Sequence, residues 1–545
     1  MRIGIDFDNT IANYDNVFKK TSAKYKLINH LWVGNKKQLK KEIIKKTKNE
    51  EVWKKIQGKV YGKYMHLSKL NLDFDNFLLR SRLKGIDVFI VSHKTIYGHY
   101  DKEKILLRKV AMKWMHNQRF FNKHFYGLDS KNIFFEKSIQ DKIKRINKLK
   151  LDYFVDDLNL ILTHKLFSKK TKKILYGNEK KLRPSSKYIV LNNWLGISNH
   201  IYGNDKLVDI KKYAEFISKK KVRQISKIQG QKNSNLYKLS FSSGLKAILK
   251  KYPNKQLDQR ERLNHEYYAL KLMKKNKFNN VTQLMFKDNI LNIIIFKWEK
   301  GKKIEKINKK DLDETIKFIK KLKNISSSQK KSFKMDAVEA CKSFQDLNLQ
   351  IKYKFNDLLR LKSKPKKFSN LLRFKLLPTL NKLYKNKNFK KTLKIFSQPL
   401  KKKFEILSPS DFGLHNALKS KNQKIIFLDF EYFGKDDPVK LIADFLLHPG
   451  MNLSLEQKKL WFKKVFIFFK KDKLFLKRLN FFISFYAFRW SLIVLNDFKI
   501  QNISEYCKFK KINKKKFLKN RLNQINKSIY FCNLINKKAF QKWLN

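Results

Sequence analysis

The sequence contains only three cysteines among its 545 residues, and these lie far apart at Cys341, Cys507 and Cys532. They form no Cys-x-x-Cys pair and have no histidine nearby, which excludes a disulfide framework and a cysteine-based zinc site. Isolated cysteines of this kind are typical of a reducing compartment. We therefore expect a cytoplasmic protein.

Long apolar runs are also missing. The longest, Phe481–Leu495, is shorter than a membrane span and contains Arg489. We interpret it as a buried helix and expect no membrane span. The N-terminus leads directly into a predicted strand, so we expect no secretory signal.

Acidic residues are scarce relative to basic ones, with 45 Asp and Glu against 126 Lys and Arg and a formal net charge of +81. A charge of this size is compatible with binding to nucleic acid or to an anionic membrane surface. The lysines, however, are spread along the whole chain, and lysine, asparagine, isoleucine and phenylalanine are abundant together, as an AT-rich genome would produce. We attribute the charge mainly to this bias, although it should still attract phosphorylated ligands.

Residues 1–204 alternate short apolar runs with longer lysine-rich segments of helical spacing. Strands are predicted at Arg2–Asp6, Asp87–Ser92, Asn132–Phe135 and Tyr153–Asp156. Strands that alternate with helices are typical of an α/β domain whose parallel sheet is covered on both faces. Residues 13–80 contain no strand run and are too long for a simple crossover, so we expect a helical insertion over the site.

Residues 205–221 form a lysine-rich stretch that we interpret as a linker. Strands are then predicted at 226–229, 236–240, 246–250, 284–286 and 292–298, with a helix at 257–273. From about residue 303 the pattern is mainly helical. A small mixed lobe (222–302) before a larger helical lobe (303–545) is the layout of an α+β bilobed kinase.

Two aspartates, Asp6 and Asp8, end the first predicted strand. They are two residues apart on an extended chain, so their side chains share a face at the strand end where open α/β sheets bind ligands. One carboxylate can attack phosphorus while the other protonates the leaving oxygen, which gives a covalent aspartyl-phosphate. Asp156 and Asp157 end another strand and offer oxygen ligands for Mg²⁺.

Two further residues can hold the phosphate at this first site. Ser92 ends a predicted strand and can donate a hydrogen bond to phosphoryl oxygens. A lysine upstream of Asp156 must offset the acidic charge, and we choose Lys142, with Lys137 as the alternative. His93 could touch a substrate, but we interpret it as a polar surface residue.

These motifs, taken in chain order, resemble the haloacid dehalogenase (HAD) superfamily of phosphohydrolases over about the first 200 residues. The resemblance implies a Rossmann-like HAD fold in which the insertion at 13–80 is the helical cap, with Asp6 as nucleophile and Asp8 as general acid/base. A retained fold with an inactive or regulatory site is the alternative. The matching residues are Asp6, Asp8 and Thr10 of the DxDxT signature, with Ser92 and Lys142 as phosphate binders and Asp156 and Asp157 as Mg²⁺ ligands together with the first two aspartates.

A second acidic group lies four hundred residues later. A kinase needs a carboxylate that orients and deprotonates the acceptor hydroxyl, and oxygen ligands for Mg²⁺ on the nucleotide phosphates. Asp411 suits the first role, and Asn416 with Asp429 suits the second. Glu431 could support or replace Asp429, or it could face solvent. We interpret His415 as a residue that stabilises the loop by a hydrogen bond rather than as a ligand.

The remaining parts of a nucleotide site lie upstream. Lys250 ends a predicted strand and Glu266 lies in the following helix, and such an ion pair can hold the lysine on the α- and β-phosphates. We interpret the segment 230–237, which includes Asn235, as the flexible turn over the phosphates. Glu299 and Gly301 follow a strand run and fit the hinge of an adenine pocket. We therefore expect ATP and Mg²⁺ as cofactors.

The second set of residues looks like the aminoglycoside phosphotransferase and choline kinase group, itself protein-kinase-like, over about residues 222–545. The HxDxxxxN motif of that group is kept in part, because Asp411 and Asn416 match while Pro409 stands at the usual histidine. Asp429-Phe430-Glu431 matches the metal-binding segment. The sequence around Asp411 is similar to that of a subgroup of uncharacterised bacterial phosphotransferases. A pseudokinase is the alternative.

We therefore predict a bifunctional enzyme, an ATP-dependent kinase for a sugar or amino alcohol fused to a Mg²⁺-dependent HAD-type phosphatase. The expected partners are ATP, a small-molecule phosphate acceptor and a phosphorylated metabolite. One alternative is a nucleic-acid-binding or polynucleotide-end-processing protein. Because the chain lacks a GxxxxGK[ST] loop and a recognition module, we do not expect nucleic acid as a partner. The other alternative is a non-catalytic metabolite sensor.

Overall fold

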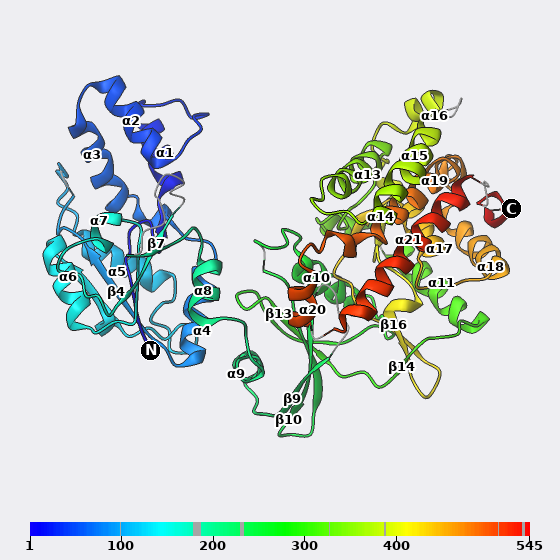
Figure 1. The fold of residues 1–545 in the computed structure, drawn as a ribbon, viewed down its shortest axis with the longest axis horizontal. Helices are drawn as coiled ribbons and strands as arrows, with labels where there is room; N and C mark the ends of the chain where they lie inside the picture. Colours follow the sequence, from blue (N-terminus) through cyan, green and yellow to red (C-terminus); the bar gives the residue numbers. More distant parts are fainter. Residues whose placement is uncertain are drawn as a thin grey trace. The chain divides into compact units, whose positions relative to one another are not determined.

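The computed structural model describes residues 1–545 except 99, 178–186, 229–233, 255, 326, 386–388, 511, 537–539 and 545. The chain divides into two compact units (Figure 1). The first comprises Met1–Lys227 with the short segments Leu239–Leu245 and Asp288–Asn292. The second comprises Ile228–Lys238, Lys246–Lys287 and Ile293–Asn545.

The first unit is built on a six-stranded sheet with strand order β5-β4-β1-β6-β7-β8, in which all neighbours run parallel. The predicted parallel sheet is therefore confirmed, and only its last two strands are not predicted from the sequence. The chain builds outward from β1 in one direction and then in the other, which makes a switch point at β1. The strands are β1 (Arg2–Ile5), β4 (Asp87–His93), β5 (Ile133–Glu136), β6 (Tyr153–Asp156), β7 (Lys172–Tyr176) and β8 (Ile189–Leu191).

Helices with one buried face accompany this sheet. On α6 (Ile139–Lys148), for example, Ile143 and Ile146 are buried in one cluster with Phe89 of β4 and Phe154 of β6. The oxygen of the Ser138 side chain accepts from the backbone of Asp141 and caps this helix at its start. The other helices are α4 (Phe74–Lys84), α5 (Leu107–Asn117), α7 (Asn159–Leu162) and α8 (Trp194–Tyr202).

The segment 205–221, interpreted above as a linker, contains the helix α9 (Leu207–Ser218) instead. Ile210, Tyr213 and Ala214 are buried at helical spacing, and α9 packs against α4. Asp205, just before the helix, lies 2.9 Å from the guanidinium of Arg80. The apolar spacing thus determines the structure here in spite of the lysines.

Three helices form the insertion expected at 13–80, namely α1 (Asp15–Lys24), α2 (Lys36–Thr47) and α3 (Glu50–Tyr61), and they group together at one end of the first unit (Figure 1). Phe18 and Trp53 stack at 5.0 Å inside this group. The short strands β2 (Ala12–Asn13) and β3 (Lys69–Leu70) pair at its base. We call α1–α3 the cap helices. Helix α4 starts within the predicted insertion but packs against β4.

A five-stranded sheet follows in the chain, with order β12-β13-β11-β10-β9, and β11 and β13 run antiparallel. All five strands predicted for this region are present, and α10 (Arg262–Lys275) follows the third, as expected. The strands are β9 (Val222–Ile228), β10 (Asn235–Phe241), β11 (Lys246–Lys251), β12 (Leu284–Asp288) and β13 (Ile293–Lys297).

The rest of the chain is mainly helical, with α19 (Phe475–Ile493) packed against α13, α17 and α21. Most of α19 is buried, as predicted for 481–495, and Arg489 bonds to Glu339 and Asp444. No helix in the described part of the chain combines the length and apolar character that a bilayer crossing needs. The other helices are α11 (Lys309–Lys323), α12 (Ser327–Ser332), α13 (Phe344–Leu359), α14 (Lys366–Leu371), α15 (Leu377–Tyr384), α16 (Phe389–Phe396), α17 (Pro438–Leu447), α18 (Leu455–Phe466), α20 (Ile503–Lys510), α21 (Lys514–Asn536) and α22 (Gln541–Leu544).

Short strands interrupt the helices and carry the second acidic group. Strand β14 (Lys302–Lys303) pairs with β16 (Ala417–Lys419), which forms an antiparallel hairpin with β17 (Ile425–Phe427). Strand β15 (Ile406–Ser408) pairs with β18 (Gly434–Asp436). Asp411 therefore follows β15, Asn416 directly precedes β16, and Asp429 comes two residues after β17.

Candidate active sites

The first acidic site lies at the carboxyl edge of the parallel sheet. Ile5 of β1 pairs with Val155 of β6 and with Ile90 of β4, so the residues that follow are brought to one edge. Lys142 of α6 places its ammonium 2.6 Å from Asp6 Oδ1 and 2.6 Å from Asp156 Oδ2. Ser92 Oγ donates a hydrogen bond of 2.9 Å to Asp6 Oδ1. The structure thus brings these four predicted residues together.

Negative charge exceeds positive charge at this edge. Oxygens of Asp6, Asp156 and Asp157 lie within 4.8 Å of one another. Burial raises the pKa of Asp156 to about 6 in spite of the Lys142 charge. Burial and the charges of Asp6 and Asp156 raise the pKa of Asp157 to about 8. Clustered carboxylates that resist ionisation in this way suit a divalent cation with oxygen ligands, so the residues fit Mg²⁺.

Two residues of the loop after β1 hold Asp157. Asn9 Nδ2 donates to Asp157 Oδ2 at 3.2 Å, and Thr10 Oγ1 donates to Asp157 Oδ1 at 3.4 Å. Asn9 has φ 62°, in the left-handed region that few non-glycine residues adopt. The hydroxyl of Thr10 therefore contacts a candidate metal ligand, and its role in phosphate binding stays a prediction.

Asp8 has two partners that the sequence analysis does not include. Lys94 Nζ lies 2.9 Å from Asp8 Oδ1 and 2.8 Å from Oδ2, and the hydroxyl of Tyr14 donates to Oδ1 at 2.6 Å. Lys94 is two residues after Ser92, so strand alternation could have placed it on the same face. Nothing in the local sequence indicates Tyr14. Both oxygens of Asp8 accept hydrogen bonds, so proton transfer by Asp8 requires the Lys94 contact to open.

The cap helices bring one more cation to the site. Lys36, the first residue of α2, donates to the hydroxyl of Tyr61 at 2.8 Å and to Asn9 Oδ1 at 3.3 Å. Burial lowers the pKa of Lys36, while the charges of Asp157 and Asp8 act in the opposite direction. The alternative lysine, Lys137, has an exposed side chain and contacts His93 only through its carbonyl oxygen.

Replacing Asp157 with asparagine should stabilise the first unit at alkaline pH when no divalent cation is present. The folded state keeps the Asp157 proton up to a pKa of about 8, whereas the unfolded chain releases it near 3.8. Wild-type stability should therefore fall relative to Asp157→Asn as the pH rises from about 4 to 8. Hydrogen–deuterium exchange of β1 and β6 peptides in the full chain with EDTA measures this difference. Mg²⁺ should protect the wild type more than the variant, and a variant that is less protected at pH 8 in EDTA would contradict the assignment.

The second site is organised around a buried lysine. Lys250 of β11 places its ammonium 2.7 Å from Glu266 Oε2 of α10, 2.7 Å from Asp429 Oδ1 and 2.9 Å from Glu431 Oε2. The hydroxyl of Tyr252 also donates to Glu266 Oε2, at 2.6 Å. Residues nearly two hundred positions apart in the sequence thus converge on one ammonium group, and we call Lys250, Glu266, Asp429 and Glu431 the Lys250 cluster.

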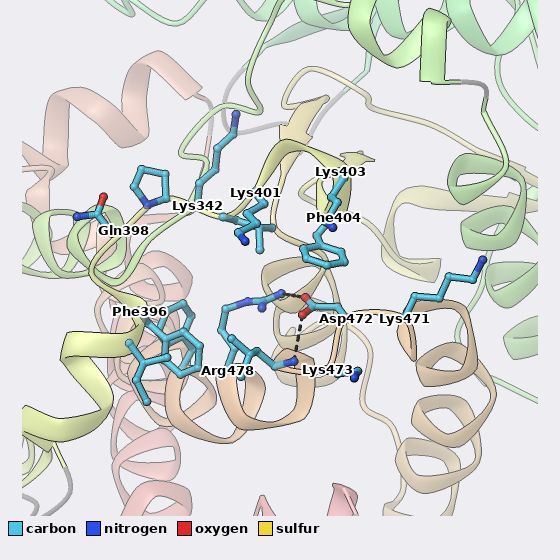
Figure 2. A pocket seen from close by; sticks show the side chains of 15 residues that line it. Lys342, Phe396, Gln398, Lys401, Lys403, Phe404, Lys471, Asp472, Lys473 and Arg478 are labelled. Atoms are coloured by element: carbon cyan, nitrogen blue, oxygen red, sulfur yellow. Dashed lines mark hydrogen bonds and ion pairs between the residues drawn. The ribbon is translucent and has the colours of Figure 1, made fainter.

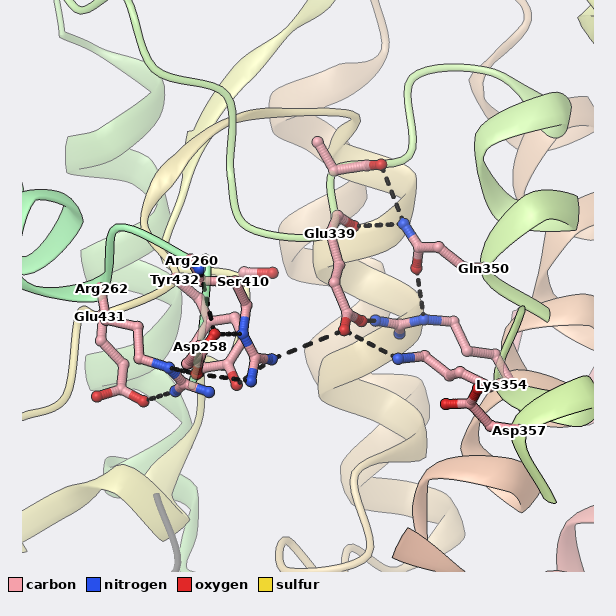
Figure 3. Close-up of polar contacts among 12 residues, drawn as sticks. Asp258, Arg260, Arg262, Glu339, Gln350, Lys354, Asp357, Ser410, Glu431 and Tyr432 are labelled. Carbon is pink, nitrogen blue, oxygen red and sulfur yellow. Dashed lines mark hydrogen bonds and ion pairs between the residues drawn. The ribbon is translucent and has the colours of Figure 1, made fainter. Parts of the chain in front are cut away.

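Glu431 is buried and does not face solvent, which removes one of the alternatives left open by the sequence. It forms an ion pair with Arg262, which also lies 2.7 Å from Asp258 Oδ2 (Figure 3). Ser234 Oγ, 3.3 Å away, donates to its other oxygen. Glu431 is therefore held in place from several directions beside Asp429.

Asp429 is the carboxylate of this cluster that is free to take a new partner. Its side chain is 39% exposed, whereas those of Glu266 and Glu431 are each 2% exposed. Partial burial and the charges of Glu431 and Glu266 raise the pKa of Asp429 to about 7, although Lys250 opposes them. Its φ of 64° is another left-handed conformation at a candidate site. Three carboxylates against Lys250 and Arg262 leave one negative charge, which fits Mg²⁺ bridged to nucleotide phosphates.

Asp411 and Asn416 lie together at the open end of the β16–β17 hairpin, the end from which the chain continues to Asp429. Asn416 Nδ2 donates to the backbone oxygen of Asp411 at 3.0 Å and to its Oδ2 at 3.2 Å. Leu428 N donates to the carbonyl of Asn416 at 2.9 Å, which places Asn416 beside the chain that leads into Asp429. Ser410, directly before Asp411, has φ 66°. The structure therefore brings Asp411, Asn416 and the Asp429 segment to one place.

Two histidines contact Asp411. His415 Nε2 lies 3.1 Å from Asp411 Oδ1, and His448 Nε2 lies 3.6 Å from the same oxygen. Partial burial acts to raise the pKa of Asp411. The hydrogen bond from His415 and the charges of His415 and His448 have the larger effect and lower this pKa below its ordinary value. Burial and His415 lower the pKa of His448 to about 3. The sequence around Asp411 does not predict the contact with His448, because His448 lies 37 positions further along the chain.

The predicted nucleotide contacts are only partly brought together. Asn235 is the first residue of β10, and residues 230–233 of the predicted phosphate turn lie outside the described residues. Glu299 follows β13, and its partial burial raises its pKa. Gly301 lies so close to β16 that an added Cβ would be 2.9 Å from Leu418 Cβ. In the part of the chain that the structure describes, neither Asn235 nor Glu299 bonds to the Lys250 cluster.

A hollow of about 450 Å³ lies elsewhere in the helical part (Figure 2). Lysines and aromatic side chains line it, among them Lys342, Lys401, Phe396 and Phe404. Arg478 at its wall bonds to Asp472 at 2.8 Å. None of the predicted site residues lines this hollow, so it is separate from both acidic sites.

Comparison with known proteins gives remote structural matches only. No protein-family model matches the sequence, and neither does any curated protein. A spectinomycin phosphotransferase in complex with ADP and spectinomycin is 11% identical with a TM-score of 0.40, over 60% of this chain and 97% of that one. The choline kinase LicA from Streptococcus pneumoniae is 14% identical with a TM-score of 0.38, over 57% and 94%. An ethanolamine kinase of Plasmodium vivax is 12% identical with a TM-score of 0.39, over 61% and 89%.

Proposed function

We propose that residues 222–545 form an ATP-dependent kinase that phosphorylates a hydroxyl group of a small molecule. One observation carries this proposal: Lys250, Glu266 and Asp429 converge on each other, while the β16–β17 hairpin places Asn416 and Asp411 beside Asp429. Phosphoryl transfer needs these three parts together, a cation on the phosphates, oxygen ligands for Mg²⁺ and a base for the acceptor.

Each residue has a definite task in this proposal. Lys250, held by Glu266, binds nucleotide phosphates, and it exchanges its contact with Asp429 for them. Asn416 and Asp429 would hold Mg²⁺, with Glu431 in support, and the ion would neutralise charge on the phosphates. Asp411 orients the acceptor hydroxyl and takes its proton. Its side chain is 40% exposed, which leaves room for an acceptor to reach the carboxylate.

We infer the class of acceptor from the resemblance of the motifs to aminoglycoside phosphotransferases and choline kinases. The acceptor would be an alcohol on a sugar, an amino sugar or a choline-like compound.

We propose further that residues 1–204 form a HAD-type phosphatase. Asp6 would attack phosphorus, with Ser92 and Lys142 on the phosphoryl oxygens and Asp156 and Asp157 on Mg²⁺. Asp8 would donate a proton to the leaving oxygen once its ion pair with Lys94 has opened. Hydrolysis of p-nitrophenyl phosphate with Mg²⁺ tests this proposal, and turnover that survives in Asp6→Asn would remove Asp6 as the nucleophile.

Phosphate transfer to a panel of small alcohols is the test of the kinase. The purified full-length chain is incubated with ATP, Mg²⁺ and sugars, amino sugars and choline-like compounds, and the products are followed by ³¹P NMR. We expect a phosphate monoester to form together with an equal amount of ADP. An unchanged ATP pool across the whole panel would contradict the kinase and favour a sensor.

A further inference from the structure

Two imidazole rings stack beside the proposed catalytic aspartate. The ring centroids of His415 and His448 are 3.6 Å apart and their planes differ by 11°. Trp490 packs edge-on against the ring of His448, with 4.9 Å between the ring centroids. The Nε1 of Trp490 donates to Asp444 at 2.8 Å. The pair is therefore held from behind by the helical core.

Two glycines make room for the two rings. A Cβ added to Gly413 would lie 2.8 Å from His415 Nδ1, and one added to Gly450 would lie 3.1 Å from His448 Cε1. Real Cβ atoms do not approach a ring nitrogen at 2.8 Å without a shift of the ring. The backbone at Gly413 and Gly450 thus packs directly against the two rings, so the stack in this position requires glycine-sized residues.

The hydrogen bonds assign the proton on each ring. The backbone N–H of Gly450 donates to His448 Nδ1 at 3.1 Å, so a neutral His448 carries its proton on Nε2, toward Asp411. His415 Nε2 is 3.1 Å from Asp411 Oδ1, and because a carboxylate oxygen accepts, this nitrogen donates. Only His415 is within hydrogen-bond distance, since His448 Nε2 is 3.6 Å from that oxygen.

The stack does not suit a metal ion. A metal bound by two imidazoles lies close to the plane of each ring, along the lone pair of its nitrogen. Two stacked rings whose planes differ by only 11° and whose centroids are 3.6 Å apart have no such common position. The group Asp411, His415 and His448 is therefore arranged for hydrogen bonding and stacking.

We propose that His415 is a positioning residue that fixes Oδ1 of Asp411 and leaves Oδ2 to take the acceptor proton, while His448 holds the His415 ring in place. This inference rests on the proposed kinase. Pro409 stands at the histidine position of the HxDxxxxN motif and offers no side-chain donor, and the hydrogen bond to Oδ1 of Asp411 comes from His415 on the C-terminal side of its loop. Asn416 donates to Oδ2 at 3.2 Å, and a carboxylate oxygen that accepts one hydrogen bond keeps a second lone pair, which can take the acceptor proton.

Two substitutions at one position separate the hydrogen bond from the ring. His415→Phe keeps a ring for stacking but removes the donor, and should lower kcat by about 10- to 100-fold with the KM for ATP within about threefold of wild type. His415→Gln keeps an N–H donor without a ring and should recover most of that loss. His116→Phe, at an exposed position of α5, is the matched control. Equal losses in both His415 variants, or a loss carried by the KM for ATP, would overturn the proposal.

A second measurement does not depend on kinase activity. Nitrogen-15 NMR of the histidine side chains in the full-length wild type should show His415 and His448 with their protons on Nε2, and Asp411→Ala should expose the His415 Nε2 proton to faster exchange. A proton on Nδ1 of His415, or no change in exchange, would overturn the positioning role. If wild type transfers no phosphate but gives these spectra, the kinase fails while the histidine arrangement stands.

Discussion

Replacing Asp411 with asparagine is expected to lower kcat for phosphoryl transfer by about a thousandfold while nucleotide affinity stays within about threefold of wild type. General base catalysis contributes roughly 10²- to 10⁴-fold, and an amide cannot accept the hydroxyl proton. The substitution keeps the shape of the side chain, and the amide oxygen can still accept from His415. Among the residues that the structure describes, no hydrogen bond or ion pair joins Asp411 to the Lys250 cluster, so nucleotide binding should not change. Steady-state kinetics and calorimetric titration with ADP and Mg²⁺ measure the two quantities.

The control for this variant is Glu456→Gln, which neutralises an exposed carboxylate of α18 and should leave both quantities unchanged. Transfer by Asp411→Asn within tenfold of wild type would remove Asp411 as the base. A parallel loss of ADP affinity would instead indicate that the loop around Asp411 supports the nucleotide site.

Replacing Lys142 with methionine should destabilise the first unit by about 3–5 kcal/mol, because removal of one partner leaves uncompensated buried charge. The ammonium contacts Asp6 and Asp156, and its side chain is 2% exposed. Burial alone would lower the pKa of Lys142, but the two carboxylates raise it above the ordinary value, so the native lysine is charged. Exchange protection of β1 and β6 peptides in the full chain measures the loss.

Lys144→Met is the matched control, since Lys144 lies on the same helix α6 with an exposed side chain. The double variant Lys142→Met with Asp156→Asn should recover part of the loss, because it removes one of the two stranded carboxylates. If Lys142→Met stays within 1 kcal/mol of this control, then the ion pairs across the sheet edge do not support the fold as described.

Much of the fold follows from local patterns. The strands β1, β4, β5 and β6 are compact apolar runs, and their ends are predicted to within one or two residues. Strand β7 begins with two lysines and β8 has only three residues, so neither forms an apolar run long enough to predict a strand. Helix α9 shows apolar residues at helical spacing, but the surrounding lysines led to the interpretation as a linker.

Site residues could be predicted where their residue type and their place at the end of a strand or in a helix indicate a function. Asp6, Asp156 and Ser92 end neighbouring strands, and Lys250 with Glu266 follows the strand–helix order, so each could be named from the sequence. Lys94, Tyr14 and His448 could not, because their partners are set by tertiary packing between segments that are distant in the sequence. The lysine bias also hides functional lysines, since one more lysine gives no contrast in this chain.

A crystal structure with ADP and Mg²⁺ tests the central claim most directly, namely that the Lys250 cluster and the β16–β17 hairpin form one phosphate-binding site. The account predicts the diphosphate on Lys250, Mg²⁺ about 2.1 Å from oxygens of Asn416 and Asp429, and Lys250 still paired with Glu266. Nucleotide bound elsewhere, with the contact between Lys250 and Asp429 unchanged at 2.7 Å, would contradict it.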